Sequence, residues 1–293
     1  MIQSENRVFI EGILSEVDLE ETTFTGRDGV SKEAIRGRIK VRVDQELNGS
    51  ITQMEVPIDV FSTRYTRNGT ENPSYHSLRE VKNGFTSIAA CGDPDQADCV
   101  RISNASLQEN VFYGRNDQLV STTRISGSFV NRINRAEMKP AATFNTTFVV
   151  GNKSEEIDAA GAPTGRLNVN GIVIQYGDRA DLVKFVVENE NAKNHIEQYW
   201  NDGDTVRVQG KLNFSVKTEY TIEEVGFGEP IKTAHTTSVH DLIITSGSAA
   251  GLEGEAAYDI TDIQSALAAR KIRIEETKKP SKTHNQKPNF GFL

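Results

Sequence analysis

The stretch 181–214 constrains the fold more than any other part of this chain. It contains a β-branched strand at 182–187, a short polar helix at 190–200, an Asp-Gly turn and a second strand at 205–214. Apolar and polar residues alternate in the second strand, which gives it one apolar and one polar face. Gly210 lies in this strand, and a glycine lets a strand bend sharply at the corner of a barrel. The stretch therefore predicts a small Greek-key barrel.

This order of features resembles the oligonucleotide-binding (OB) fold, and in particular the bacterial and phage single-stranded DNA-binding proteins. The third strand, helix and fourth strand of that family are similar to 183–187, 191–200 and 206–212 of this chain. The fourth strand carries the family's alternating hydrophobic residues before Gly-x-Leu. The resemblance implies a closed barrel whose second and third strands, with the loops beside them, bind single-stranded DNA.

The chain of 293 residues is long enough for two domains, and it repeats a pattern internally. Residues 98–104 parallel 204–210, and 124–130 loosely parallel 7–13. We therefore predict a mainly β protein of two tandem OB-fold-like Greek-key barrels with short capping helices. The predicted domains are a first barrel at 5–118, a second at 119–247 with a long insertion at 134–165, and at 248–293 a linker, a short amphipathic helix and a flexible basic tail.

A predicted strand at 34–43 carries a row of four cations. Its period of two places isoleucine and valine on one face and Arg36, Arg38, Lys40 and Arg42 on the other. Like charges on one exposed strand face repel one another unless anions lie over them. Two interpretations stay open. Either Glu55 and Asp59 of the next strand neutralise the row, or the row follows the phosphates of a nucleic acid.

Aromatic residues close to cations predict a surface on which bases stack. The residues that we predict to bind nucleic acid are Arg36, Arg38, Lys40, Arg42, Phe61, Tyr65, Phe112, Tyr113, Arg132, Arg135, Arg207, Lys211, Phe214 and Tyr220. The insertion, with its basic opening, either folds over a strand of nucleic acid or packs as a hairpin on its own barrel. Trp200 is predicted to plug the base of the barrel.

No catalytic motif is visible, and we predict a protein that is not an enzyme and uses no cofactor or metal. The five histidines lack metal-ligand spacing, and the spacing of Cys91 and Cys99 favours reduced thiols. A net charge of −8 argues against binding through bulk charge but permits a local basic surface. Because no apolar run approaches ~18 residues and no signal peptide is visible, we expect a cytoplasmic protein, in the bacterial host if a phage encodes it.

These features and the resemblance predict sequence-tolerant binding of single-stranded DNA in phage DNA replication or recombination. Cations would release counterions from the backbone, and rings would stack on any base. Two alternatives stay open: a structural or assembly β-protein of a virion that binds no nucleic acid, and an RNA-binding OB protein. Phe290, Phe292 and Leu293 are predicted to dock on a replication or recombination protein. The tail before them is basic, which departs from the acidic tail typical of the family.

Overall fold

The first barrel has the strand order of an OB fold. The computed structural model describes residues 5–26, 29–114, 117–177, 179–223, 227 and 231–277. The elements of this barrel are β1 (Asn6–Thr25), β2 (Ser31–Leu47), β3 (Ser50–Thr63), α1 (Pro73–Gly84), α2 (Ile88–Cys91), β4 (Cys99–Tyr113) and β5 (Leu119–Ser126). β1 pairs antiparallel with β2 and with β4, and β4 pairs antiparallel with β5. β3 and β5 pair in parallel at Ile58 and Ile125, which closes the barrel.

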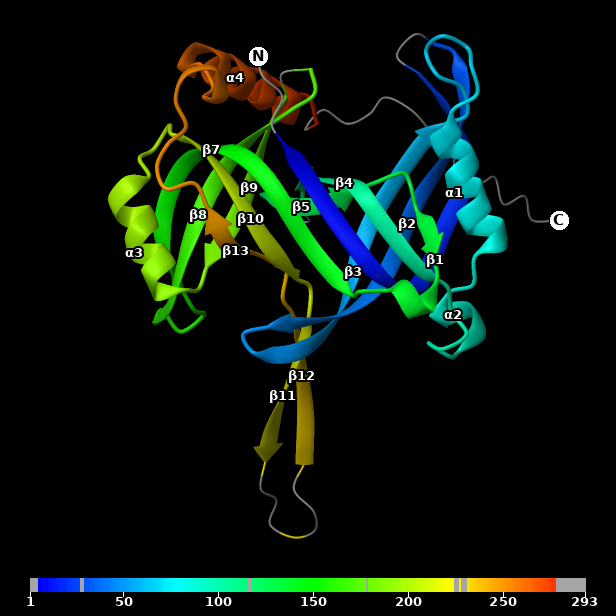
Figure 1. Cartoon of the computed structure of the whole chain (residues 1–293), viewed down its shortest axis with the longest axis horizontal. Coiled ribbons are helices and arrows are strands. Elements are labelled where there is room, and N and C mark those ends of the chain that lie inside the picture. The colour runs from blue at the N-terminus through cyan, green and yellow to red at the C-terminus, as the bar shows by residue number, and fades with distance from the viewer. Residues whose placement is uncertain are drawn as a thin grey trace, which may run out of the picture.

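The second barrel repeats this order (Figure 1). Its elements are β7 (Ala141–Ile157), β8 (Pro163–Gln175), β9 (Arg179–Val187), α3 (Glu190–Tyr199), β10 (Thr205–Asn213) and β13 (Asp241–Gly247). β9 and β13 pair in parallel at Val186 and Ile243, as β3 and β5 do in the first barrel. A hairpin of β11 (Val216–Glu223) and β12 (Ile231–Ser238) is inserted between β10 and β13. The predicted fold class, mainly β with two tandem OB-fold-like barrels, is confirmed.

The two barrels share one sheet and one core. β1 and β7, the first strand of each barrel, pair antiparallel from Asn6 and Thr146 to Glu11 and Ala141. The buried Gln45 of β2 also crosses the junction, because its side chain donates to the Leu212 carbonyl at 2.8 Å. A single cluster of buried apolar side chains extends through both barrels. The barrels are therefore packed as one body rather than linked by a flexible connection.

Glycines lie where strands pass close to other backbone. A Cβ on Gly210 of β10 would lie 2.2 Å from the carbonyl oxygen of Ile243 and 2.2 Å from Cζ of Phe144. Gly37 of β2 has a φ of 144°, and a Cβ there would lie 2.0 Å from the carbonyl oxygen of Asp18. Both positions exclude any side chain, which is the physical reason for the glycine-bent strand that the sequence indicates.

The helices between the third and fourth strands of each barrel begin at asparagines. The Asn189 side chain accepts from the Ala192 amide at 3.1 Å and caps α3. The Asn72 side chain caps α1 by accepting from the Ser74 amide at 3.2 Å. Trp200, which follows α3, is buried and donates its indole N–H to the Ser248 carbonyl at 3.0 Å. It fills the end of the second barrel beside Phe148.

We place the division between the barrels after β5, in the segment that holds β6 (Asn131–Ile133) and η1 (Arg135–Glu137). The sequence pattern predicts the second barrel to begin at 119, but β5, which starts there, pairs with β3 and β4. The stretch 141–157, predicted as part of an insertion, is β7, the first strand of the second barrel. Its Phe144 and Phe148 are buried in the core, which is why this stretch cannot be a surface loop.

The C-terminal helix α4 (Ile260–Thr277) follows the short helix η2 (Gly254–Ala256) and lies across the second barrel (Figure 1). Its apolar face buries Ile263, Ala266 and Ile274. The amphipathic helix predicted near this position is therefore present. No helix in the described ranges is both long and apolar enough to span a membrane.

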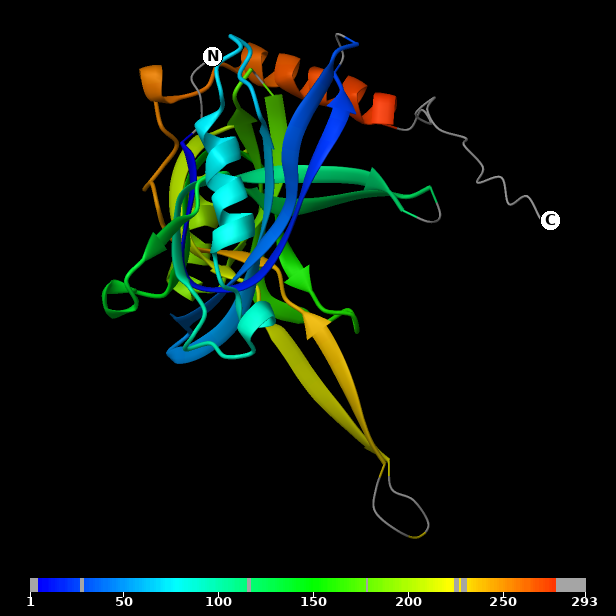
Figure 2. The ribbon, with the colours of Figure 1, turned by 90° about the vertical axis from the view of Figure 1, so that its right-hand side faces the viewer.

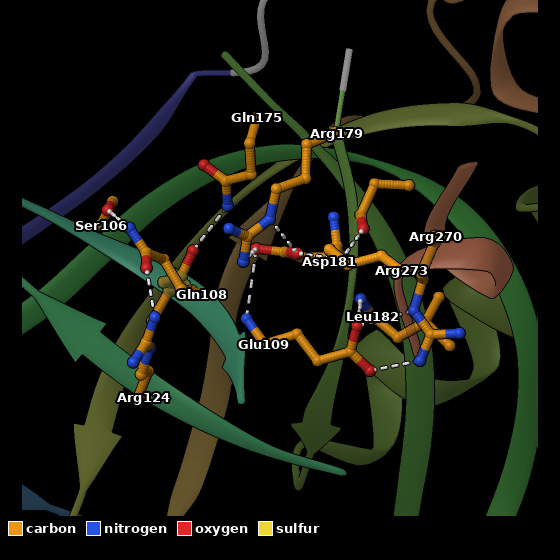
Figure 3. Close-up of polar contacts among 12 residues, drawn as sticks. Ser106, Gln108, Glu109, Arg124, Gln175, Arg179, Asp181, Leu182, Arg270 and Arg273 are labelled. Atoms are coloured by element: carbon orange, nitrogen blue, oxygen red, sulfur yellow. Dashed lines mark hydrogen bonds and ion pairs between the residues drawn. The ribbon is translucent and has the colours of Figure 1, made fainter. Parts of the chain in front are cut away.

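Two buried carboxylates join α4 to both barrels (Figure 3). Glu109 of β4 accepts from Arg270 of α4, with Oε2 at 2.7 Å from Nε and a second contact between Oε1 and Nη2. Asp181 of β9 accepts from the Glu109 amide at 3.2 Å and from Arg273 at 3.3 Å. Arg179 also donates to Asp181, at 2.9 Å. Because both carboxylates are buried, the arginines of α4 supply charge compensation that water does not.

Candidate nucleic-acid interface

The row of four cations on β2 is paired with carboxylates. Arg36 pairs with Glu20 at 2.7 Å, Arg38 with Asp59 at 2.8 Å, Lys40 with Glu16 at 2.5 Å and Arg42 with Asp44 at 3.2 Å. The hydrogen bond with Asp59 raises the pKa of Arg38, and the hydrogen bond with Glu16 raises the pKa of Lys40. Carboxylates of β1 and β3 therefore flank the row on both sides.

These ion pairs leave the row accessible but nearly neutral. The side chains of Arg36 and Glu20 are 58% and 61% exposed, and exposed pairs of this kind contribute only about 0–1 kcal/mol. The expectation that acids neutralise the row identified Asp59 but not Glu16 and Glu20. Those two lie beside Lys40 and Arg36 because β1 continues to Thr25.

Exposed rings lie at one end of the same face. Phe61 of β3, directly opposite Arg36, is 54% exposed, and Tyr65 is 48% exposed. Phe24 packs edge-on against Phe61, with 5.7 Å between ring centroids. Beside them is a hollow of about 630 Å³ lined by Phe24, Val30, Ser31, Lys32, Glu33, Thr63, Arg64, Tyr65, Thr66 and Arg67. Rings beside guanidinium groups are suited to a base and its phosphate.

A second hollow, of about 490 Å³, lies beside the middle of the row, where the β11–β12 hairpin leaves the second barrel. Arg38 and Lys40 line it together with Pro57 of β3 and the ring pair of Phe214 and His240. Those two rings stack at 4.9 Å between centroids. Phe214 is only 7% exposed, whereas His240 is exposed, so the ring that faces solvent is the histidine.

A third hollow, of about 520 Å³, continues past the same ring pair onto the second barrel. Its lining is Ser121, Thr122, Thr123, Asn170, Leu182, Val183, Lys184, Phe214, His240 and Leu242. Figure 2 shows the β4–β5 and β11–β12 hairpins leaving the barrels on the same side. Residues of β5 in the first hairpin and residues that flank the second hairpin line this hollow. We call the face from Tyr65 past the cation row and His240 to Lys184 the groove face.

The other predicted residues lie elsewhere or have structural contacts. Phe112 and Tyr113 are at the end of β4, in the β4–β5 hairpin, and Phe112 is half exposed. Arg132 donates to the Gly84 carbonyl at 2.6 Å and pairs with Asp98, and Arg135 donates to the Ala97 carbonyl at 2.7 Å. Both arginines therefore fix the connection between the barrels to the first barrel.

Arg207 and Lys211 lie on β10, away from the cation row. Arg207 is 3.5 Å from Glu5, and Lys211 donates to the Glu46 carbonyl at 2.8 Å. Lys211 lines a separate hollow of about 420 Å³ with Arg7, Phe9 and others, where β1, β7 and β10 meet. Tyr220 lies on β11, and its side chain is outside the described structure. Phe290, Phe292 and Leu293 also lie outside the described residues.

A family model named YorF matches residues 4–280. The chain belongs to the YorF family. A search of curated protein sequences returns no match.

Two solved structures of the single-stranded DNA binding protein from Thermus aquaticus are similar to this YorF family member. The wild-type structure has 9% sequence identity and a TM-score of 0.49, and the match covers 89% of this chain and 99% of that one. A deletion variant has 10% identity and a TM-score of 0.48, with 87% and 98% covered.

The YorF family chain also brings residues to the groove face that sequence reasoning did not select. Phe24 lies in a segment that reads as a polar loop in the sequence, but it belongs to β1. The meeting of His240 and Lys184 at one hollow has no local signal in the sequence, since strands far apart in sequence form that hollow. An alternating β9 with Lys184 on its polar face was the one available hint.

Among the described residues of this YorF family member, no group of three or more His, Cys, Asp or Glu side chains is arranged to hold a metal ion. Cys91 and Cys99 are free thiols, and burial raises the pKa of Cys99. The groove face offers rings, cations and hydroxyl groups, a combination that is suited to contacts with bases and phosphates.

Proposed function

We propose that this protein binds single-stranded DNA with little sequence preference, along the groove face, in DNA replication or recombination. The observation that carries the proposal is the spacing of solvent-exposed rings along one open face, with Phe61 and Tyr65 at one end of the row of cations and His240 beside its middle. Every base has a π face, so rings of this kind tolerate any sequence. Tolerance of sequence suits a protein that covers strands exposed when a duplex opens.

Stacking supplies most of the affinity in this proposal. A base on an aromatic ring contributes about 1–3 kcal/mol, whereas a cation already paired with a carboxylate releases few counterions when a phosphate arrives. The paired cations of β2 donate hydrogen bonds to the backbone but add little net positive charge. The proposed binding therefore depends weakly on salt for a protein of this class.

The resemblance of 181–214 to bacterial and phage single-stranded DNA-binding proteins supports the proposed binding, and a phage setting stays part of the proposal. A docking role for Phe290, Phe292 and Leu293 with a replication or recombination protein stays a prediction. Titration of fluorescently labelled oligo-dT at two salt concentrations tests the proposal directly. Binding at low salt is expected, and its absence would end the proposal. Competition with duplex DNA and with RNA of the same length separates DNA binding from RNA binding.

Replacing Phe61 or Tyr65 by alanine is expected to weaken oligo-dT binding by about 1–3 kcal/mol each, a loss of roughly 5- to 150-fold. Both rings are about half exposed, so their removal should leave the fold intact. Tyr199→Ala is the matched control, because Tyr199 is 48% exposed but lies on α3, away from the groove face. Equal affinity for the Phe61 or Tyr65 variants and the control would remove these rings from the site.

Replacing all four cations of the β2 row by serine is expected to change the salt dependence of oligo-dT binding only slightly. A free cation on single-stranded DNA contributes about 0.7 to the slope of log K against log salt. We expect the slope for the quadruple variant to fall by less than about 0.7. In the opposite direction, Glu16→Gln with Glu20→Gln frees Lys40 and Arg36 and should steepen the slope. A large loss of slope in the serine variant would show that the row binds phosphate despite its acidic neighbours.

A second candidate function is a structural or assembly protein that binds no nucleic acid. The complete pairing of the β2 row with carboxylates is the observation that favours it. Such a face would contact another protein through balanced charges. Failure of oligo-dT to bind at low salt, together with a concentration-dependent assembly by light scattering, is the result expected for this candidate.

A further inference from the structure

The third hollow, on the second barrel, differs from the rest of the groove face in its charge. Its lining contains Lys184 and His240 but no carboxylate among the described residues. The other two hollows of the groove face each include a glutamate, Glu33 in the first and Glu55 in the second. An anion that follows the groove face therefore meets its least repulsive surroundings here.

Lys184 differs from the cations of β2 because no partner holds it. Within the described part of the chain, its ammonium group makes no hydrogen bond or ion pair. It is exposed on the outward face of β9, opposite Asn170 of β8. Ser121, Thr122 and Thr123 of β5 also line this hollow, although the Ser121 hydroxyl donates to Glu109. One unpaired ammonium group among neutral side chains matches the chemistry of a phosphodiester.

We propose that this third hollow is the principal phosphate subsite of the protein, and that Lys184 neutralises a backbone phosphate there. This inference rests on the proposed binding of single-stranded DNA. The stacked rings of His240 and Phe214 border the hollow, so a base next to that phosphate lies against the histidine ring. The second barrel then supplies the ionic contact and the His240 ring, while the first supplies the exposed rings of Phe61 and Tyr65.

With a phosphate at Lys184, most of the salt dependence of DNA binding comes from this one residue. A phosphate at Lys184 displaces only solvent and ions, whereas a phosphate at Arg38 or Lys40 has to compete with Asp59 or Glu16. Removing one free cation lowers the slope of log K against log salt by about 0.7 on single-stranded DNA. Lys184→Gln should therefore change the slope about as much as the quadruple serine variant of β2, or more.

The test is a salt series of labelled oligo-dT titrations on the wild-type chain, Lys184→Gln and Lys271→Gln. Lys271 is the matched control, since it is an exposed lysine on α4 with no ion pair in the described structure. The expected result is a slope reduced by about 0.7 and a weaker affinity at low salt for Lys184→Gln alone. Thermal melting of both variants should match the wild type, because both side chains are exposed.

A second measurement gives an independent readout. Lysine acetylation followed by mass spectrometry should show Lys184 protected when oligo-dT is bound and Lys271 equally reactive with and without it. Wild-type binding with equal slopes for both variants, and no protection of Lys184, would overturn the subsite but leave the proposed function standing. Absence of wild-type binding at low salt would overturn both.

Discussion

Replacing Arg270 by glutamine is expected to lower the free energy of unfolding by about 3–5 kcal/mol. Glu109, its partner, has a side chain with no exposed surface, and the Arg270 side chain is only 16% exposed. The variant would leave the carboxylate buried with the Ser121 hydroxyl at 2.6 Å and the Leu182 amide at 3.3 Å as its remaining donors. Urea unfolding followed by circular dichroism measures the change.

Arg7→Gln is the control for this prediction, because Arg7 is an exposed arginine that lies away from α4. Surface substitutions of this kind stay within about 0.5 kcal/mol. If Arg270→Gln lowers the free energy of unfolding no more than the control does, the ion pair with Glu109 does not stabilise the packing of α4.

The difference in stability between the wild type and Arg270→Gln should depend on pH. Burial raises the pKa of Glu109, but hydrogen bonds from Arg270 and Ser121 outweigh it and hold the pKa below the ordinary 4.5. A carboxyl with a lowered pKa in the folded state contributes stability at pH values above its ordinary pKa and loses it as the pH falls through the folded pKa. The difference between wild type and Arg270→Gln should therefore be full at neutral pH and should shrink as the carboxyl is protonated in acid.

Replacing Gly210 by alanine is expected to destabilise the protein by at least about 3 kcal/mol, at the upper end of the usual cost of overpacking. The new Cβ would meet the Ile243 carbonyl oxygen and the Phe144 ring at 2.2 Å. Gly210 pairs with both Phe144 of β7 and Ile244 of β13, so β10 cannot move away from either neighbour without breaking a ladder. Urea unfolding again gives the measurement.

Gly84→Ala serves as the matched control. Gly84 ends α1, and a Cβ there would have no atom within 4 Å. An alanine in such open space changes stability by less than about 1 kcal/mol. Similar stability of the two alanine variants would contradict the close packing of β10 at the barrel corner.

Local patterns in the sequence predict the strands and helices of the fold, but they do not predict every pairing between strands. The alternation of Ile39 and Val41 and the glycine at 210 lead to strands and a barrel, because each depends on residues a few positions apart. The predicted boundary between the barrels at 118 is wrong because it depends on contacts between residues that are far apart in sequence. β5 belongs to the first barrel through its pairing with β3, a contact between segments more than sixty residues apart that no local pattern records.

The candidate site was predictable only where one strand contains it. The row on β2 follows from a period of two, and the exposure of Phe61 follows from its place on the polar side of β3. The carboxylates of Glu16 and Glu20 could not be assigned to the row without the register of β1. The sequence predicts that Phe214 stacks on bases, whereas in the structure His240, which follows β12, stacks on the Phe214 ring.

The antiparallel pairing of β1 with β7 has a consequence for how a polymer with a direction crosses this molecule. Paired first strands relate the two barrels by a local twofold axis, and such an axis reverses direction. A single DNA strand that crosses both barrels would meet equivalent surfaces in opposite 5′-to-3′ senses, so one set of side chains could not serve both. Duplication therefore leaves each barrel free to acquire its own chemistry, as neutralised cations on β2 and an unpaired lysine on β9 illustrate.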